Sequence, residues 1–164
     1  MKKHLTFILS FTFMMIFSQI ENIKNGEKIT LRIHYGFLNA GYATLTANQV
    51  NYRNAPHYRV TGVGKSTGAT RAFFKVDDVY ESYINIATGL PSHYVRNVSE
   101  GGYKRHFETD FNHDNQTLVL TNKLDKTSKN FKTVKGIQDM ISAFYYLRSM
   151  DASNFKVGSS LKIN

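Results

Sequence analysis

The sequence predicts a mainly β fold: a curved antiparallel sheet or open barrel, arranged as a meander, with one amphipathic helix near residues 137–150. Two patterns predict this class. Apolar and polar residues alternate in six or seven short segments, roughly ten residues apart, with turn-forming residues between them. One later segment has its apolar residues three and four positions apart, which is the period of an α-helix.

Alternation defines the strands. Ile29, Leu31 and Ile33 alternate with polar residues, so the first segment has one apolar side and one polar side. A turn at residues 36–41 joins it to a second alternating segment, which predicts a hairpin. The glycine pair at residues 101–102 predicts another hairpin turn. By these criteria strands are expected at residues 27–35, 42–52, 57–65, 73–86, 92–98, 103–112 and 117–124.

Residues 137–150 form the only helix that the sequence predicts. Asp139 lies in its first turn and Arg148 in its last, and both charges suit the helix dipole. Its apolar residues are expected to pack against the sheet: Ile137, Met140, Ile141, Phe144 and Leu147.

Residues 155–164 alternate again, through Leu161 and Ile163, and predict a strand at the very end of the chain. Because no turn or polar tail follows it, we expect that later strands are missing and that an open sheet edge remains. The expected organisation is a signal peptide at residues 1–18 and a single β-rich domain at residues 19–164, incomplete at its C-terminus.

The amino-terminal residues predict export. Lys2 and Lys3 precede an apolar run at residues 5–17, and the small residue Ser18 follows, as in a secretory signal peptide. The run is shorter than the about 20 residues that a membrane-spanning helix needs. We therefore expect a mature chain without a transmembrane helix, in the periplasm or associated with the outer membrane.

The composition excludes several classes of function. The chain has no cysteine, which excludes disulfides, thiolate metal sites, a cysteine nucleophile and a lipid-modified cysteine. The net charge of +9 favours an anionic neighbour, but the Lys and Arg residues are scattered, so nucleic acid is not an expected partner. The densest basic segment, residues 123–135, is interpreted as a solvated connection, with peripheral contact to an anionic membrane surface or polysaccharide as the alternative.

The sequence GVGKST at residues 62–67 resembles the second half of a phosphate-binding loop. The full motif needs a glycine where this chain has Arg59, and it needs a helix directly after the hydroxyl residues. Strand-like residues 73–74 follow instead, so no nucleotide is expected. Gly62 and Gly64 are interpreted as a bend or bulge in a curved sheet.

No catalytic or metal-ligating constellation stands out. Asp77, Asp78 and Glu81 form the only acidic cluster, and pairing with Lys or Arg is favoured over a cation site because Asp78 would point away from the other two. The histidines show no metal-ligand spacing, and no nucleophile motif is present, so no cofactor, metal or catalytic residue is assigned: His34, His57, His93, His106 and His113. Ten tyrosines and no tryptophan fit either a ligand groove on a concave face or ordinary strand-forming residues.

The order and spacing of several short segments resemble an exported family called domain of unknown function 3108. The resemblance covers the chain from about Gly26 to its last residue. It implies a β-rich periplasmic or outer-membrane-associated protein without an established activity, whose members usually continue with more strands. The segments are GEKI at residues 26–29, YGFLNAG at 35–41, GVGKS at 62–66, DDVYESY at 77–83, TGLP at 88–91, EGGY at 100–103, QDM at 138–140 and YYLR at 145–148.

The leading functional hypothesis is a noncatalytic exported domain that binds a lipid-like, glycan or protein ligand of the cell envelope through the concave face of its sheet. Two alternatives stay open. One is a hydrolase of envelope polymers that uses Asp77 or Glu81. The other is a purely structural envelope component.

Overall fold

The computed structural model describes residues 23–151, 153, 155–158, 160–161 and 163–164. The expected signal peptide at residues 1–18 lies outside the described residues. No helix in the described ranges is long and apolar enough to cross a membrane.

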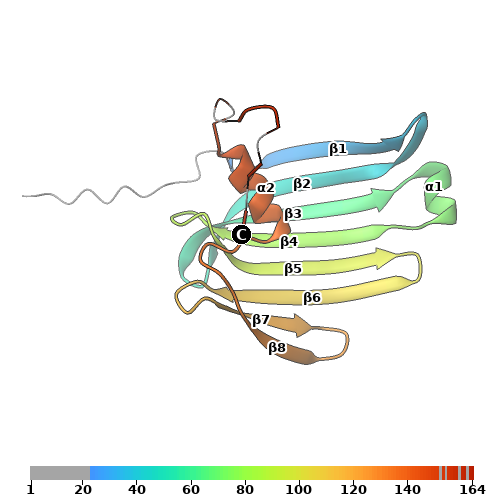
Figure 1. Ribbon diagram of the computed structural model, residues 1–164. Coiled ribbons are helices and arrows are strands. Elements are labelled where there is room, and N and C mark those ends of the chain that lie inside the picture. The colour runs from blue at the N-terminus through green and yellow to red at the C-terminus, as the bar shows by residue number, and fades with distance from the viewer. Residues whose placement is uncertain (1–22, 152, 154, 159, 162) are drawn as a thin grey trace, which may run out of the picture.

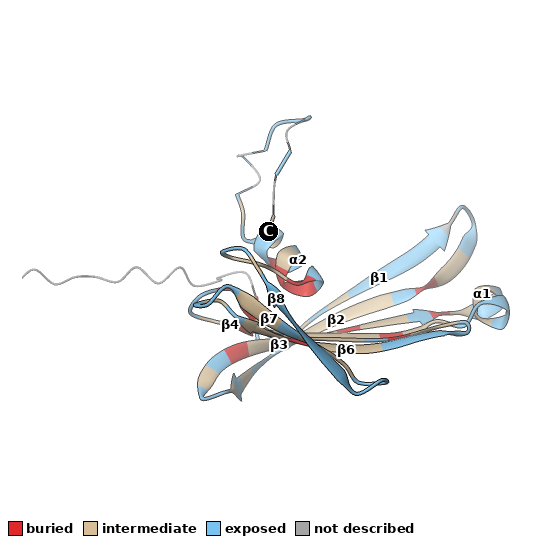
Figure 2. Ribbon diagram, turned by 60° about the horizontal axis from the view of Figure 1, so that its bottom comes forward, coloured by how far each residue is buried: buried red, intermediate tan, exposed pale blue. Residues whose placement is uncertain are grey.

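The described chain forms one antiparallel sheet of eight strands that follow one another in chain order, so β1 and β8 lie at opposite edges (Figure 1). The sheet is strongly twisted (Figure 2). This confirms the mainly β meander and shows that it is open rather than closed. The strands are β1 (Glu27–Tyr35), β2 (Leu38–Tyr52), β3 (Ala55–Ser66), β4 (Asp77–Asn85), β5 (Pro91–Glu100), β6 (Tyr103–Asn112), β7 (Thr117–Asn122) and β8 (Thr127–Lys132).

A short helix interrupts the segment that was expected to continue into β4. Helix α1 (Gly68–Phe73) connects β3 to β4, so the prediction of a single helix and of a strand at residues 73–86 is wrong at this point. The helix is fixed from both ends. Thr67 donates its backbone N–H to Ala40 at 3.1 Å, and Arg71 binds the Asp77 carboxylate with two hydrogen bonds of 3.0 Å.

The two C-terminal expectations also change. The basic segment at residues 123–135 contains strand β8, all six residues of which are exposed. The described residues between 155 and 164 are not in a strand, so that prediction is wrong. Gly158 there has a φ of 85°, in the left-handed region. The end of the segment instead meets the loop before α2, where Gln138 donates its backbone N–H to Asn164 O at 2.8 Å.

Glycines within the strands do not bend the sheet by a bulge. The β2–β3 and β3–β4 registers run through Gly62 and Gly64 without a shift, so the interpretation of a bulge there is wrong. The register shifts instead between Ile33 and His34 and between Tyr83 and Ile84. The predicted hairpin turn at Gly101 is confirmed, with a φ of 57°.

Helix α2 (Met140–Arg148) lies across one face of the sheet, which we call the helix-bearing face (Figures 1 and 2). The expected helix began at residue 137, but Asp139 is the N-cap. The Asp139 carboxylate accepts hydrogen bonds from the backbone N–H groups of Ile141 and Ser142, at 2.8 and 2.9 Å, and from Ser82 Oγ at 2.6 Å. Burial raises the pKa of Asp139, although these hydrogen bonds oppose the shift.

The core lies between α2 and the sheet. The far end of α2 is held by β1, because Glu27 accepts two hydrogen bonds from the Arg148 guanidinium, at 2.6 and 3.0 Å, and one from the Tyr145 hydroxyl at 3.2 Å. Burial raises the pKa of Tyr145 to about 12. The buried apolar residues are Ile23, Ala47, Val60, Ile84, Ile141 and Tyr145.

Candidate functional site

A trough runs along the strands of the helix-bearing face, between α2 and α1. Two cavities of about 210 and 230 Å³ form it, and Gly64 lines both of them. Met140 and Ile141 of α2 bound the first cavity, and Thr70 of α1 bounds the second. The trough is therefore a continuous surface feature that begins where the helix stops covering the sheet.

The floor of the trough is made of small residues of β2 and β3, most of them at alternating positions. A Cβ atom at Gly41 would lie 2.4 Å from the carbonyl oxygen of Lys65, so the close backbone approach requires glycine there. A Cβ atom at Gly64 would contact only Asp78 Cβ, at 3.8 Å, so the space above Gly64 is open. The floor residues are Ala40, Gly41, Ala43, Gly62, Gly64 and Ser66.

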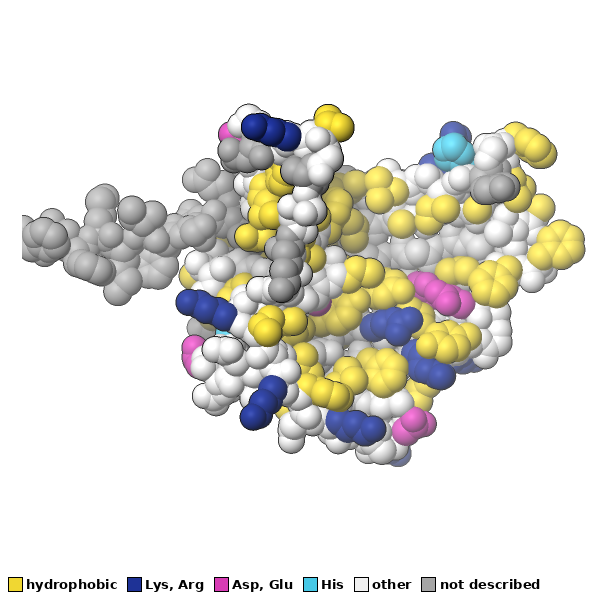
Figure 3. Space-filling model, viewed as in Figure 1, with side chains coloured by type: hydrophobic (Ala, Val, Ile, Leu, Met, Phe, Trp, Pro, Cys, Tyr) yellow, Lys and Arg dark blue, Asp and Glu magenta, His cyan; other side chains and the backbone are white. Residues whose placement is uncertain are grey.

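The walls of the trough come from β1 and β4. Leu31 and Ile33 form one wall and are 49% and 52% exposed, which is unusual for neighbouring aliphatic residues on a sheet face. Tyr80 and Asp78 belong to the opposite wall. Apolar side chains gather on this face beside α2 (Figure 3). Since each strand residue advances about 3.3 Å, the floor between Gly62 and Ser66 spans about 13 Å.

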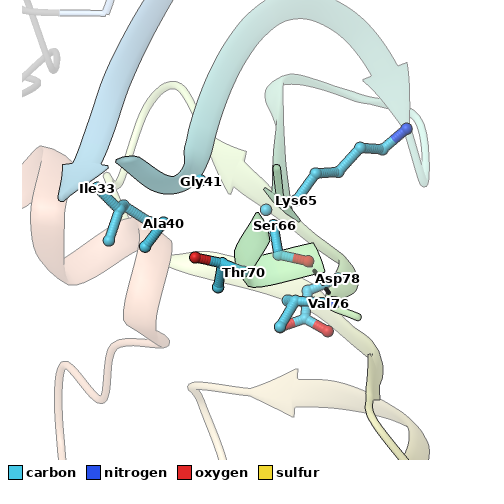
Figure 4. Close-up of a pocket in the computed structure, with 9 residues that line it drawn as sticks. Ile33, Ala40, Gly41, Lys65, Ser66, Thr70, Val76 and Asp78 are labelled. Atoms are coloured by element: carbon cyan, nitrogen blue, oxygen red, sulfur yellow. Dashed lines mark hydrogen bonds between the residues drawn. The ribbon is translucent and has the colours of Figure 1, made fainter. Parts of the chain in front are cut away.

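The α1 end of the trough contains polar groups (Figure 4). Ser66 Oγ accepts the backbone N–H of Val76 at 2.8 Å, and Asp78 Oδ1 accepts the backbone N–H of Ser99 at 2.9 Å. Thr70 Oγ1 is buried and has no hydrogen-bond partner among the described residues. A buried unpaired hydroxyl is rare in native proteins, and Thr70 is one of the residues that line this end of the trough.

The segment at residues 62–67, which resembles half of a phosphate-binding loop, contributes to this trough but cannot bind a phosphate. The Lys65 side chain points away from the cavity (Figure 4). The backbone N–H groups of Ser66 and Thr67 donate to the carbonyl oxygens of Val76 and Ala40, at 3.2 and 3.1 Å. Phosphate binding needs such amides to be free, and here they complete the strand pairing.

The acidic cluster is divided between the two faces of β4. Asp77 pairs with Arg71, and the hydrogen bonds of that guanidinium lower the pKa of Asp77. Glu81 pairs with Arg59 at 2.5 Å. Asp78 lies on the helix-bearing face. The structure thus brings Asp77 and Glu81 to arginines rather than to one another, and favours a structural role for both carboxylates.

A histidine on the opposite face is paired at both ring nitrogens. His57 Nδ1 lies 2.9 Å from the carbonyl oxygen of Ala55, so Nδ1 carries the proton and Nε2 accepts a hydrogen bond from Ser92 Oγ at 2.8 Å. The His57 ring is only 2% exposed. This Ser–His pair resembles a nucleophile with its base, but its burial leaves no access for a substrate.

The remaining histidines do not gather either. His93 Nδ1 is 2.8 Å from Asp110 Oδ1, and its ring lies beside those of Tyr52 and Tyr83. Among the residues that the structure describes, no three His, Asp or Glu side chains are arranged to hold a metal ion.

Sequence reasoning missed the trough. It proposed the concave face of the sheet as a binding surface but assigned no residues to it. A signal was present, because β2 and β3 both place small residues at alternating positions, as in Gly62, Gly64 and Ser66. The register that sets these residues beside Gly41 and Ala43 is a tertiary fact.

The fold defines the class of this chain: a mainly β protein with a single open meander sheet and a helix across one face. A family model described as "Protein of unknown function (DUF3108)" matches residues 30–164, and the chain belongs to this family. No curated protein and no solved structure matches the chain.

Proposed function

We propose that this chain is a noncatalytic exported domain that binds a lipid-like ligand, with the ligand's acyl chain in the trough. The observation that carries the proposal is the open, mostly apolar trough between α2 and α1. Its walls include half-exposed Leu31 and Ile33, and its floor has no side chain above Gly64. An acyl chain in this trough would remove apolar surface from water, at about 25 cal/mol per Å².

The shape and chemistry of the trough favour a lipid over a glycan or a protein. A glycan needs a dense set of hydrogen-bonding side chains, whereas most of the residues lining the trough are apolar or glycine. A trough about 13 Å long, with a floor two strands wide, suits a linear chain better than a protein surface.

The experiment is a titration of the full chain, purified without detergent, with palmitate, followed by native mass spectrometry. Wild-type protein is expected to take up palmitate. Gly64→Leu should lose at least about tenfold in affinity, because its side chain would fill the open space. Gly64 does not have a positive φ, so the substitution is compatible with its backbone.

The matched control is Gly102→Leu. Gly102 also lacks a positive φ, and a Cβ atom there meets nothing within 4 Å, but it lies in the β5–β6 turn outside the trough. This variant should bind palmitate as wild type does. A wild-type protein that takes up no palmitate, or a Gly64→Leu variant that binds equally well, would refute the proposal.

A further inference from the structure

One end of the sheet presents large apolar side chains directly to water. In a meander, alternate connections lie at the same end, so the β1–β2 turn, α1, the β5–β6 turn and the β7–β8 turn share one end, which we call the α1 end (Figure 1). Phe37 is fully exposed and Phe73 is 91% exposed. Apolar side chains project at this end (Figure 3). Further exposed apolar residues there are Leu38, Phe74, Tyr103 and Leu124.

The opposite end of the sheet is different. Its connections are the β2–β3, β4–β5 and β6–β7 turns, at residues 53–54, 86–90 and 113–116. Asn54, Thr88, Asp114 and Asn115 are typical of these turns, and none of the described exposed large apolar side chains lies in them. Among the described turns that join adjacent strands, exposed aromatic rings therefore occur at the α1 end and not at the opposite end; other exposed apolar residues, such as Val134 and Phe155, lie in the segments on either side of α2.

The apolar residues of the α1 end stand on a fixed scaffold. Gly101 donates its backbone N–H to the carbonyl oxygen of Lys75 at 2.8 Å, and a Cβ atom at Gly101 would lie 3.0 Å from the Phe74 ring. Arg71 also donates to the carbonyl oxygen of Val76, at 3.1 Å. These contacts hold α1 against the neighbouring turn, so Phe73 is presented outward by packed structure rather than by a loose loop.

Basic side chains also lie at the α1 end, although one of them, Lys75, pairs with Asp77 at 3.5 Å. The Lys75 side chain is 65% exposed, and Lys104 and Arg105 are exposed beside Tyr103, with the Arg105 guanidinium 4.4 Å from the ring centroid. Protruding aromatic rings with a basic border are the features of proteins that insert side chains into the interface of an anionic membrane. The net charge of +9 has the sign that such a surface attracts.

We propose that the α1 end is a membrane-docking surface, which places Phe37 and Phe73 in the interfacial layer of an anionic bilayer. The proposal goes beyond ligand binding and does not depend on it. It also gives the trough an orientation, because the cavity lined by Thr70 lies beside α1. In this orientation the cavity beside α1 is nearer to the bilayer than the one beside α2.

Tryptophan scanning of the full chain tests this surface, because the natural chain has no tryptophan and each variant carries one reporter. Phe37→Trp and Phe73→Trp are compared with Asp114→Trp, which places the reporter in an exposed turn at the opposite end. The probes are phosphatidylcholine–phosphatidylglycerol vesicles that contain dibrominated acyl chains. We expect a blue shift and several-fold stronger quenching for Trp at positions 37 and 73 than for Trp at position 114.

Two further measurements sharpen the test. The paired variant Phe37→Ser and Phe73→Ser should weaken vesicle partition by about tenfold or more. Val157→Ser, which removes another fully exposed apolar side chain, should not. Partition should also weaken on vesicles of phosphatidylcholine alone and at high salt. Equal quenching at all three reporter positions would overturn the proposal. So would the absence of quenching at positions 37 and 73, even if another part of the chain contacted the vesicle.

Discussion

The trough has two ends, one beside α2 and one beside α1, whose floors consist of the same kinds of residue but are packed to different degrees. At its α2 end the trough floor is closely packed: a Cβ atom at Gly62 would lie 3.1 Å from Leu45 and 3.7 Å from Ile141. Two residues further along the same strand, Gly64 has only Asp78 within 4 Å. The local sequence of β3 is equally small in both places, so the difference comes from where α2 ends.

This contrast separates packing from function. Small strand residues beneath a helix let the helix approach closely, and the buried interface stabilises the fold. The same residues without a helix above them leave half-exposed apolar walls, which cost stability and are typical of binding surfaces. We therefore expect substitutions under α2 to act on the free energy of unfolding, and substitutions in the trough to act on ligand binding.

The largest expected effect is the loss of the helix anchor. Tyr145→Ala removes a ring with no exposed surface and should lower the free energy of unfolding by about 3–5 kcal/mol, because it leaves a cavity between α2 and the sheet. Tyr146→Ala, at the next position of α2, removes a 39% exposed ring and should cost less than about 1 kcal/mol. Urea unfolding measures both, and equal losses would contradict the assignment of Tyr145 to the core.

A second expected effect compares the two glycines directly. Gly62→Val should destabilise the protein by about 1–3 kcal/mol, because its side chain meets Leu45 and Ile141 in a packed region. Gly64→Val should be neutral or stabilising by up to about 0.5 kcal/mol, because valine suits a strand and the space is open. Thermal unfolding of the two variants decides this, and a comparable loss for Gly64→Val would show that the trough is closed in solution.

The smallest expected effect is a pH dependence of the free energy of unfolding, which comes from the C-terminal end of α2. The hydrogen bonds from Arg148 lower the pKa of Glu27 below 4.5, so the ionised carboxylate stabilises the fold above that pH, and this contribution is lost as the pH falls through the lowered pKa. Glu27→Gln should cost about 1 kcal/mol at neutral pH.

Urea unfolding at pH values above and below 4.5 isolates this contribution. The stability difference between wild type and Glu27→Gln should shrink at the acid end of the series. A difference that stays constant with pH would show that the ion pair between Glu27 and Arg148 adds nothing to the attachment of α2.

The elements that the sequence predicted correctly have strong local signals. The alternation of Ile29, Leu31 and Ile33 places them on one face of β1 because strand geometry repeats every two residues. The spacing of Ile137, Met140, Ile141, Phe144 and Leu147 predicts the existence of α2 correctly. The prediction that this stripe packs against the sheet is wrong for Met140, Phe144 and Leu147, which are 58%, 37% and 43% exposed. The buried face of α2 consists of Ile141, Ser142 and Tyr145, because Asp139 and Arg148 fix the helix in that rotation. The errors occur where local signals are short or ambiguous. Residues 68–73 form fewer than two helical turns, and so short a segment shows no recognisable helical period in the sequence.

Strand β8 was missed for a different reason. Its six residues are all exposed, so they carry no apolar alternation, and β8 forms because it pairs with β7, as in the pairing of Leu118 with Phe131. The predicted strand at residues 155–164 had alternation but found no neighbour to pair with among the described residues. A strand needs a partner as well as a pattern.

By itself the sequence determined the chain's β class, the order of most strands and the existence of α2, because hydrophobic periodicity and turn residues act over a few positions. It also determined the absence of any thiol chemistry. Only the tertiary structure decided that Gly41, Ala43 and Gly64 lie side by side, that α2 stops short of Gly64, and that Phe37 and Phe73 share one end. Those relations depend on strand register and on where the helix docks, which residues far apart in the chain fix together.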